Sequence, residues 1–419
     1  MNIHYVLRGL GGMIGICLLA WLCSEKKKQV NLKQVCCGLL IQLFLAALLL
    51  KFPLSKELFL ILNKGVLLLQ EATKAGTSFA FGYIGGGDPP FAEPFPGAGF
   101  ILAFQALPII LVMSALSALL TYWRVLPALV RLFSGLFQKT MGIGGALAVG
   151  ASANIFIGMV ESPLLIRPYL ARMTRSELFA TMTCGMATIA GTVLVLYVTI
   201  LDKLLPEAAG HILTASIISV PAAITVARIM IPETEDLTQG DMSPDQEATS
   251  SMDAIAKGTA DGVGLFLHIT AMLVVLVSLI HLVNLLLGLF PDVLGAPITM
   301  QRILGYVMAP VAWLMGIPWQ EALPAGSLLG IKTVLNEFLA YMELAKMPEQ
   351  VLSPRSTVIL TYALCGFANF GSLGIMIGGM GTMAPERKKE IVALGIRSII
   401  AGTLATCLTG ATVGILYGG

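Results

Sequence analysis

Residues 154–168 constrain the fold more than any other stretch of this chain, because they are apolar overall yet carry polar and helix-breaking residues. Glu161 lies near their centre, between Gly158 and Pro163. A carboxylate in the middle of a bilayer costs roughly 2.5–3.5 kcal/mol on insertion scales, so it is kept mainly where it faces protein, water or a ligand. Glycine and proline interrupt helices, and the stretch therefore predicts a re-entrant hairpin with Glu161 as a candidate site residue. The alternative is a structural carboxylate that pairs with a neighbouring helix.

A similar arrangement recurs in the second half of the chain. The sequence Cys-Gly-Met-Ala-Thr-Ile-Ala-Gly-Thr at 184–192 follows the Glu161 stretch, and Cys-Gly-Phe-Ala-Asn-Phe-Gly-Ser at 365–372 follows an apolar stretch that holds Asn336 and Glu337. Interrupted segments in matching positions of two halves are typical of the binding site of a transporter. The order of these motifs predicts two repeats, each a glutamate-bearing hairpin followed by a broken helix.

The composition places the chain in the membrane. Of its 419 residues, 56% are hydrophobic and only 12% are charged, which is too apolar for a soluble domain. The net charge of +2 gives no reason to expect nucleic acid as a partner. The seven cysteines form neither a disulfide framework nor a CxxC metal pattern, and no cofactor is expected.

Hydropathy and loop charge predict an all-α polytopic membrane protein with about eight transmembrane helices. The loop with Lys26, Lys27, Lys28 and Lys33 is expected in the cytoplasm, which puts the N- and C-termini on the outer face. The spans are expected at 5–23, 34–50, 99–121, 178–201, 211–230, 261–290, 357–383 and 391–417.

The remaining segments complete the expected topology. Residues 66–81, 124–139 and 301–315 are expected to lie at the membrane surface, and 232–257 is interpreted as a cytoplasmic linker. The first hairpin then enters from the inside and the second from the outside, which makes an inverted repeat. The predicted units are 1–140, with the first spans and surface helices; 141–230, the first repeat; 231–316, with the linker, a long span and an outer surface helix; and 317–419, the second repeat.

Two features suggest other chemistry. Gly-Gly-Gly-Asp at 85–88 matches the GxGD motif of intramembrane aspartyl proteases, but that reaction needs a second aspartate, and no apolar span ahead of Asp88 holds one. Neither HExxH nor GxSxG is present, so an intramembrane hydrolase is the least favoured hypothesis. His268 and His281 lie in the long span, where each is a candidate proton carrier, although a packing role is favoured for both.

Five motifs together resemble one family over nearly the whole chain, the bacterial concentrative nucleoside transporters. They are Phe-Gln-Ala-Leu-Pro at 104–108, Glu-Ser-Pro-Leu-Leu-Ile-Arg-Pro at 161–168, Ala-Thr-Ile-Ala-Gly at 187–191, Asn-Glu-Phe at 336–338 and Gly-Phe-Ala-Asn-Phe at 366–370. The resemblance implies a homotrimer in the bacterial inner membrane. In it, a transport domain built from both hairpins and both broken helices moves against a scaffold. It also implies nucleoside uptake driven by sodium or, in some members, by protons.

The resemblance implies that ribose contacts fall on Glu337, Asn369 and Ser372, with Phe367 nearby. These residue types suit the task, because a carboxylate and an amide can hold vicinal hydroxyl groups by hydrogen bonds. A carrier of the same architecture for another small polar solute is the alternative.

Base contacts are implied on the first hairpin and on Val193. Family members commonly carry Gln-Thr or Gln-Ser just before the hairpin glutamate, whereas this chain has Met159 and Val160 ahead of Glu161. Two hydrogen-bonding side chains are thus replaced by apolar ones. We therefore expect base selectivity to rest on stacking and on Glu161.

The resemblance also implies a sodium site between the first hairpin and the first broken helix. Its side-chain ligands fall on Asn154 and Thr188, and its carbonyl ligands on Ile157, Thr188 and Ile189. Neutral oxygens of this kind suit a hard monovalent cation, although simple interhelical hydrogen bonding is the alternative role for both side chains. A proton-driven carrier would instead use a titratable group, for which Glu161, Glu337 and His268 are the candidates.

Overall fold

The computed structural model describes residues 3–91, 99–202, 204–205, 207–239, 248–293 and 295–417. Within these residues the chain forms helices joined by turns and loops, with an isolated β-bridge between Val293 and Ala296. Seven helical segments there are long and apolar enough to cross a membrane, or up to eight if one bent pair is counted as a span. The prediction of an all-α polytopic membrane protein is confirmed.

The N-terminal helices form a peripheral group. Asn31 caps the second long helix by accepting hydrogen bonds from two backbone N–H groups, and Pro53 starts the next helix where its missing N–H costs nothing. This next helix begins well before residue 66, so the predicted surface segment 66–81 was too short. The elements are α1 (Ile3–Leu22), η1 (Lys27–Gln29), α2 (Leu32–Lys51), α3 (Pro53–Phe81), η2 (Gly82–Gly85), α4 (Leu102–Gln105), α5 (Ile109–Tyr122) and α6 (Val125–Met141).

The first repeat contains the predicted hairpin and broken helix. One arm of the hairpin is α7 (Gly145–Ala153), and the other consists of two short helices, α8 (Glu161–Leu164) and α9 (Arg167–Leu170). The turn at 154–160 includes Gly158, but Pro163 lies inside α8, where it was expected to mark a break. Because the third N–H of a helix has no intrahelical partner, proline is tolerated there. The broken helix is α10 (Arg175–Ala187) and α11 (Gly191–Leu201), followed by α12 (Ala208–Met230).

The connection between the repeats is shorter than predicted. The structure places Ser251–Leu287 in one helix, α13, so the predicted linker 232–257 ends at residue 250. Ser250 starts the helix because its hydroxyl accepts a hydrogen bond from the backbone N–H of Asp253. Helix α14 (Met300–Leu314) then meets the first arm of the second hairpin at an angle of 118°.

The second repeat has the same order of elements as the first. Its hairpin is α15 (Trp319–Val334) and α16 (Glu337–Lys346), and its broken helix is α17 (Pro354–Leu364) and α18 (Phe370–Met383), followed by η3 (Pro385–Arg387) and α19 (Lys388–Leu416). The expected span 357–383 is therefore present as two helices separated at 365–369.

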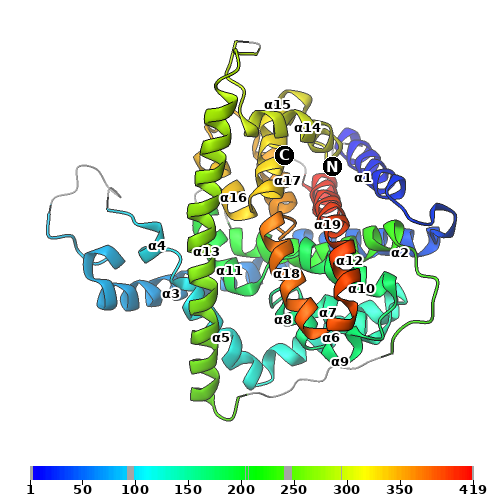
Figure 1. Cartoon of the computed structure of the whole chain (residues 1–419), viewed down its shortest axis with the longest axis horizontal. Helices are drawn as coiled ribbons and strands as arrows, with labels where there is room; N and C mark the ends of the chain where they lie inside the picture. Colours follow the sequence, from blue (N-terminus) through cyan, green and yellow to red (C-terminus); the bar gives the residue numbers. More distant parts are fainter. Residues whose placement is uncertain are drawn as a thin grey trace.

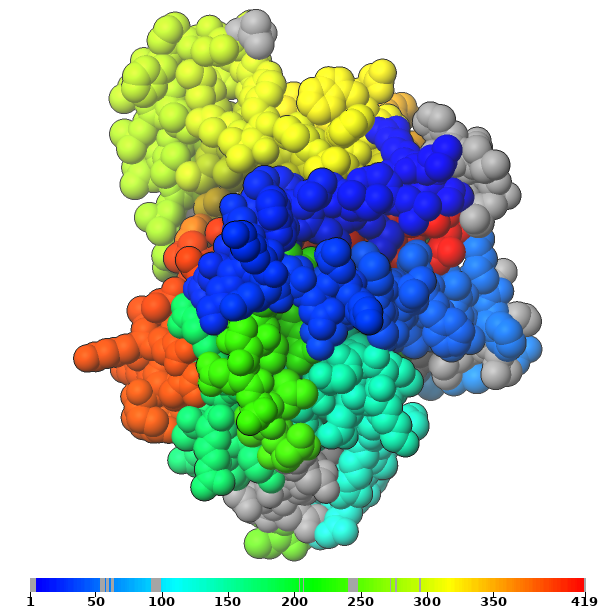
Figure 2. All heavy atoms as spheres, turned by 90° about the vertical axis from the view of Figure 1, so that its right-hand side faces the viewer, coloured from blue at the N-terminus to red at the C-terminus, as the bar shows by residue number. Residues whose placement is uncertain are grey.

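The two hairpins lie on opposite sides of the molecule. Figure 1 shows α15 and α16 in its upper part and α7, α8 and α9 in its lower part, with the two chain ends on one side. The broken helices, α12 and α19 form the buried centre, whereas the N-terminal helices cross one face, as Figure 2 shows in blue. This arrangement brings the interrupted segments of both repeats together in the middle of the protein.

Candidate binding site

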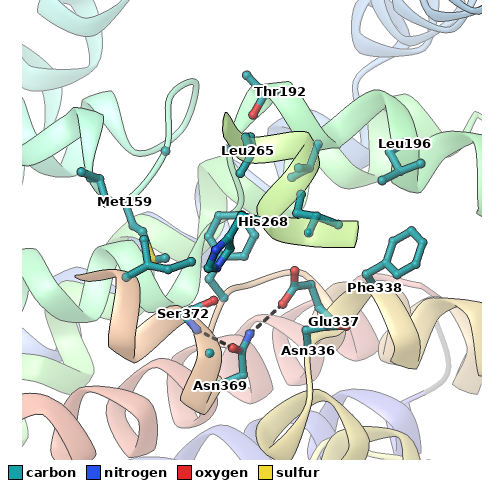
Figure 3. A pocket seen from close by; sticks show the side chains of 18 of the residues that line it. Met159, Thr192, Leu196, Leu265, His268, Asn336, Glu337, Phe338, Asn369 and Ser372 are labelled. Carbon is teal, nitrogen blue, oxygen red and sulfur yellow. Dashed lines mark hydrogen bonds between the residues drawn. The ribbon is translucent and has the colours of Figure 1, made fainter. Parts of the chain in front are cut away.

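One cavity of about 150 Å³ lies where the two hairpin turns meet the two helix breaks. It is lined by every residue that the sequence assigned to substrate binding: Met159, Val160, Glu161, Val193, Glu337, Phe367, Asn369 and Ser372. Figure 3 shows Glu337, Asn369 and Ser372 of the second repeat on one side of it, and Thr192 and His268 among apolar side chains elsewhere. The structure thus brings the predicted residues together, while their role in binding stays a prediction.

Glu337 is the more buried of the two carboxylates on this cavity. It is the first residue of α16, where its negative charge is favoured by the positive end of the helix dipole. Tyr197 Oη donates to its Oε1 at 2.5 Å, and Asn369 Nδ2 donates to its Oε2 at 3.0 Å. The carboxylate is therefore held in one orientation from two other helices and retains lone pairs for a ligand hydroxyl.

Asn369 joins this carboxylate to the second helix break. Its Oδ1 accepts from the backbone N–H of Ser372 at 2.7 Å and so caps the start of α18, and its Nδ2 binds Glu337. Figure 3 shows both bonds as a chain from Ser372 through Asn369 to Glu337. One side chain thus fixes both the helix start and the acidic group.

The first hairpin contributes a second carboxylate and an apolar surface. The Glu161 side chain is accessible, whereas Met159 is 7% exposed. A Cβ atom on Gly158 would lie 2.1 Å from Glu161 Oε2, so glycine leaves room for this carboxylate. Val160 completes an apolar stretch ahead of the acid, as the sequence indicated.

Helix α13 closes the cavity from outside both repeats. His268 lines it together with Leu265 and Ile269, and Figure 3 draws it among the side chains around the cavity. His281, on the same helix, is exposed and does not line the cavity. His268 thus lines the cavity and His281 does not, while the packing role favoured for both histidines stays a prediction.

The residues of the predicted cation site lie at the junction of the first hairpin with the first break. Asn154 and Thr188 are each 1% exposed, and Gly191 N–H donates to Phe156 O at 3.1 Å across this junction. Asn154 Nδ2 donates to Gly150 O, but among the described residues nothing donates to its buried Oδ1. A buried amide oxygen without a donor is a suitable ligand for a cation.

The two helix breaks touch each other directly. Phe367 N–H donates to Thr188 O at 3.2 Å, and a Cβ atom on Gly366 would lie 2.9 Å from Ala187 O. Glycine is therefore required for the close approach of the two backbones. The carbonyl of Thr188, a predicted cation ligand, is thus hydrogen-bonded to Phe367, which lines the cavity.

Sequence reasoning missed Tyr197, which binds Glu337, and Thr192, which lines the cavity. Tyr197 stands in an apolar run and carries no signal beyond its hydroxyl. Thr192 follows the repeated glycine of the break and could have been found by comparing the two motifs. Asp88, the protease-like aspartate, is exposed and does not line the cavity.

An inverted repeat of hairpins and broken helices around a central cavity with a few polar groups defines a secondary membrane transporter. The family described as Na+ dependent nucleoside transporter matches with its N-terminus at residues 11–84 and its C-terminus at 211–414, and a region described as nucleoside recognition matches 103–204. The chain belongs to the concentrative nucleoside transporter family and is a transporter, not an enzyme.

Individual relatives match over nearly their whole length. The chain is 38% identical to an uncharacterized transporter, YutK, of Bacillus subtilis, over 98% of this chain and 99% of that protein. It is 36% identical to the nucleoside permease NupC of Helicobacter pylori, over 97% of each chain. The structure of CNTnw in an inward-facing substrate-bound state matches with a TM-score of 0.90 and 38% identity, over 98% of this chain and 97% of that one.

Proposed function

We propose that this protein imports nucleosides into the cell, coupled to the entry of sodium. The observation that carries the proposal is the Glu337–Asn369 pair, two hydrogen-bonded groups whose side chains meet on the wall of the central cavity. A carboxylate with free lone pairs accepts from ribose hydroxyls, and Ser372 adds a further polar group. Family membership and the nucleoside permease among the relatives support this substrate class.

The ribose proposal is tested by removing the charge at Glu337. Glu337→Gln and Asn369→Ala should each weaken nucleoside binding by about 1–3 kcal/mol, because buried polar partners are left unsatisfied. Uptake of radioactive uridine and adenosine into proteoliposomes measures the effect. Glu343→Gln, an exposed position on the same helix, is the control. Full-affinity uptake by both site variants would contradict the assignment.

The base is proposed to lie against Met159, Val160 and Val193, with Glu161 as its polar contact. Since two of the hairpin side chains are apolar, we expect purine and pyrimidine nucleosides to compete for uptake, whereas free ribose does not. Combining Met159→Gln with Val160→Thr should sharpen the preference for one base class. Strict rejection of one class by the unmodified protein would count against this arrangement.

Sodium is proposed to bind Asn154 and Thr188, with carbonyl oxygens of Ile157, Thr188 and Ile189. The unpartnered Oδ1 of Asn154 supports this donor set, since neutral oxygens suit a monovalent cation. When bound, the ion would supply positive charge at the junction of hairpin and break. The residues themselves hold that junction through the bond from Gly191 N–H to Phe156 O.

The coupling ion is tested with a double variant. Asn154→Ala with Thr188→Val should raise the sodium concentration needed for half-maximal uptake. Thr183→Val, which removes a buried hydroxyl on α10 that donates to Phe179 O, should leave this concentration unchanged. Proton coupling is the second candidate, because Glu161 and His268 both face the cavity. Uptake that persists when choline replaces sodium, but is abolished by a proton ionophore, would favour proton coupling over sodium coupling.

Transport is proposed to proceed by alternating access in a homotrimer. The hairpins and broken helices would move as one domain against a scaffold that includes α13. Helix α13 exposes apolar side chains along its length, including Val274, Leu282 and Leu285, which suits contact with lipid or a neighbouring subunit. Cross-linking followed by mass measurement would test the trimer.

A further inference from the structure

Lys332 is a buried cation that the assigned site residues do not include. It lies on α15, five positions before Glu337, and has no exposed area. An unpaired ammonium group is costly to bury, so it is kept where hydrogen bonds and an opposite charge offset its desolvation. Lys332 Nζ donates to Ala363 O at 2.8 Å and to Thr406 Oγ1 at 2.7 Å.

Both acceptors place this ammonium at the second helix break. Ala363 is in the last turn of α17, whose carbonyl groups lose their intrahelical partners because the helix ends at Leu364. A cation at a helix C-terminus is also favoured by the helix dipole. Thr406 Oγ1 uses its own proton on Thr403 O, so its lone pairs are available to Lys332. Phe367 and Asn369 follow Ala363 within six residues.

The Lys332 ammonium group also interacts with the Glu337 carboxylate on the cavity wall. Lys332 and Glu337 belong to one hairpin, carry opposite charges and interact electrostatically. The other ionisable groups near Glu337 are Tyr197 from α11, Tyr341 on α16 and Cys365 at the second break. The thiols of Cys365 and of Cys407 on α19 also lie near Lys332. Glu161 and His268 face it across the cavity. Among these groups, Lys332 is the one amine, and it lies on the same hairpin as the carboxylate.

We propose that Lys332 is a positioning residue for nucleoside binding. Its ammonium ties the second hairpin to the break between α17 and α18, and it balances the buried charge of Glu337. The carboxylate therefore stays ionised and accepts the ribose hydroxyls. This inference rests on the proposed function. At the corresponding junction of the first repeat, the buried Oδ1 of Asn154 accepts no hydrogen bond among the described residues. At the junction of the second repeat, the Lys332 ammonium group supplies the positive charge.

The experiment measures nucleoside affinity against pH for the full-length protein in lipid nanodiscs. Isothermal titration with uridine and adenosine compares the unmodified protein with Lys332→Met, Glu337→Gln and the double variant. Lys332→Met should weaken binding about tenfold or more near neutral pH, because the uncompensated carboxylate takes up a proton. Its affinity should recover as the pH rises from about 6 to about 9, where the carboxylate ionises again.

The double variant separates charge balance from packing. With Glu337→Gln present, Lys332→Met should cause little further loss and no recovery with pH. A purely structural lysine would instead lower affinity equally at every pH and in both backgrounds, which would overturn the proposal. If Lys332→Met does not fold, Lys332→Gln retains a donor for Ala363 O and should show the same pH dependence.

The remaining outcomes also decide the question. Failure of both lysine variants to fold would make Lys332 a structural residue only and overturn the proposal. If the unmodified protein binds nucleosides and Glu337→Gln loses binding, but Lys332→Met binds normally at all pH values, only this inference fails. If the unmodified protein binds neither nucleoside, the proposed function fails with it.

Discussion

At the scale of single residues, the site depends on how firmly one carboxylate is oriented. Glu337 accepts from a tyrosine on α11 and an asparagine at the second break, so three separate elements determine its position. Hydrogen bonds to a charged group are stronger than neutral ones, which makes this arrangement rigid. A rigid acceptor loses little conformational entropy when the ligand binds.

Removing one of these two hydrogen-bond donors should lower nucleoside affinity while the Glu337 carboxylate stays in place. Tyr197→Phe deletes the hydroxyl that binds Glu337 Oε1, and we expect nucleoside affinity to fall by roughly 1–2 kcal/mol. Titration calorimetry measures the loss. Tyr341→Phe is the matched control, because its hydroxyl is equally buried but donates to Thr361 O. Equal effects of the two variants would show that the loss reflects packing only.

Gly158 gives a second prediction at this scale. A Cβ atom there would collide with Glu161 Oε2, so Gly158→Ala should displace the carboxylate and reduce affinity for the base. Gly374→Ala, at a position with open space around it, should bind normally. Competition by nucleosides with different bases measures the change. Unchanged competition in Gly158→Ala would mean that Glu161 does not contact the base.

Sequence reasoning could identify the residues that carry charge or break helices, because an acid or a glycine inside an apolar stretch is itself a signal. It could not find Tyr197, since an aromatic residue in an apolar helix is typical of packing and its partner lies 140 positions away. His268 was similarly ambiguous until the position of α13 was known.

At the scale of secondary-structure elements, the breaks are built from local chemistry. Asn369 caps α18 by binding Ser372 N–H, and Asn336 caps α16 by binding Leu339 N–H. Both caps stand directly at the cavity. The same side chains that start the helices therefore carry polar groups into the site.

The two roles of Asn369 can be separated. Serine also caps helices, so Asn369→Ser should keep the cap but lose the donor to Glu337, whereas Asn369→Ala should lose both and cost about 1 kcal/mol of stability. We expect the melting temperature to fall for the alanine variant more than for the serine variant. Nucleoside affinity should fall in both. Normal affinity in Asn369→Ser would show that the amide donor is not needed.

The order of elements was predictable, but several boundaries were not. Hydropathy located both hairpins and both breaks, since interruption by glycine and polar residues is visible in the sequence. It placed the start of α13 too late, because Ser251, Asp253 and Lys257 interrupt the apolar run and the helical state of this stretch depends on the cap at Ser250. It also misjudged Pro163, whose tolerance depends on its place within α8.

At the scale of the whole molecule, an ion network joins the peripheral helices to the centre. Glu25, between α1 and η1, pairs with Arg175 at the start of α10 and with Arg397 on α19. Arg175 also pairs with Glu390. The hydrogen bond from Arg175 lowers the pKa of the Glu25 carboxyl below its ordinary value of 4.5, and Arg397 adds to this.

A lowered pKa in the folded state means that this network stabilises the protein above pH 4.5 and that the stabilisation is lost as the pH falls below it. Glu25→Gln should therefore melt at a lower temperature than the unmodified protein at pH 7, and the difference should shrink on acidification. Glu343→Gln, which removes an exposed pair with Lys346, is the control. A difference that persists at low pH would contradict the ion-pair explanation.

The contact between the two breaks has a thermodynamic consequence. The backbone of Thr188 accepts a hydrogen bond from Phe367, while its side chain belongs to the proposed cation site. If both ligands bind where we propose, each stabilises one end of the same bond, and their binding free energies are coupled. Linkage then requires reciprocity: the factor by which sodium raises nucleoside affinity must equal the factor by which nucleoside raises sodium affinity.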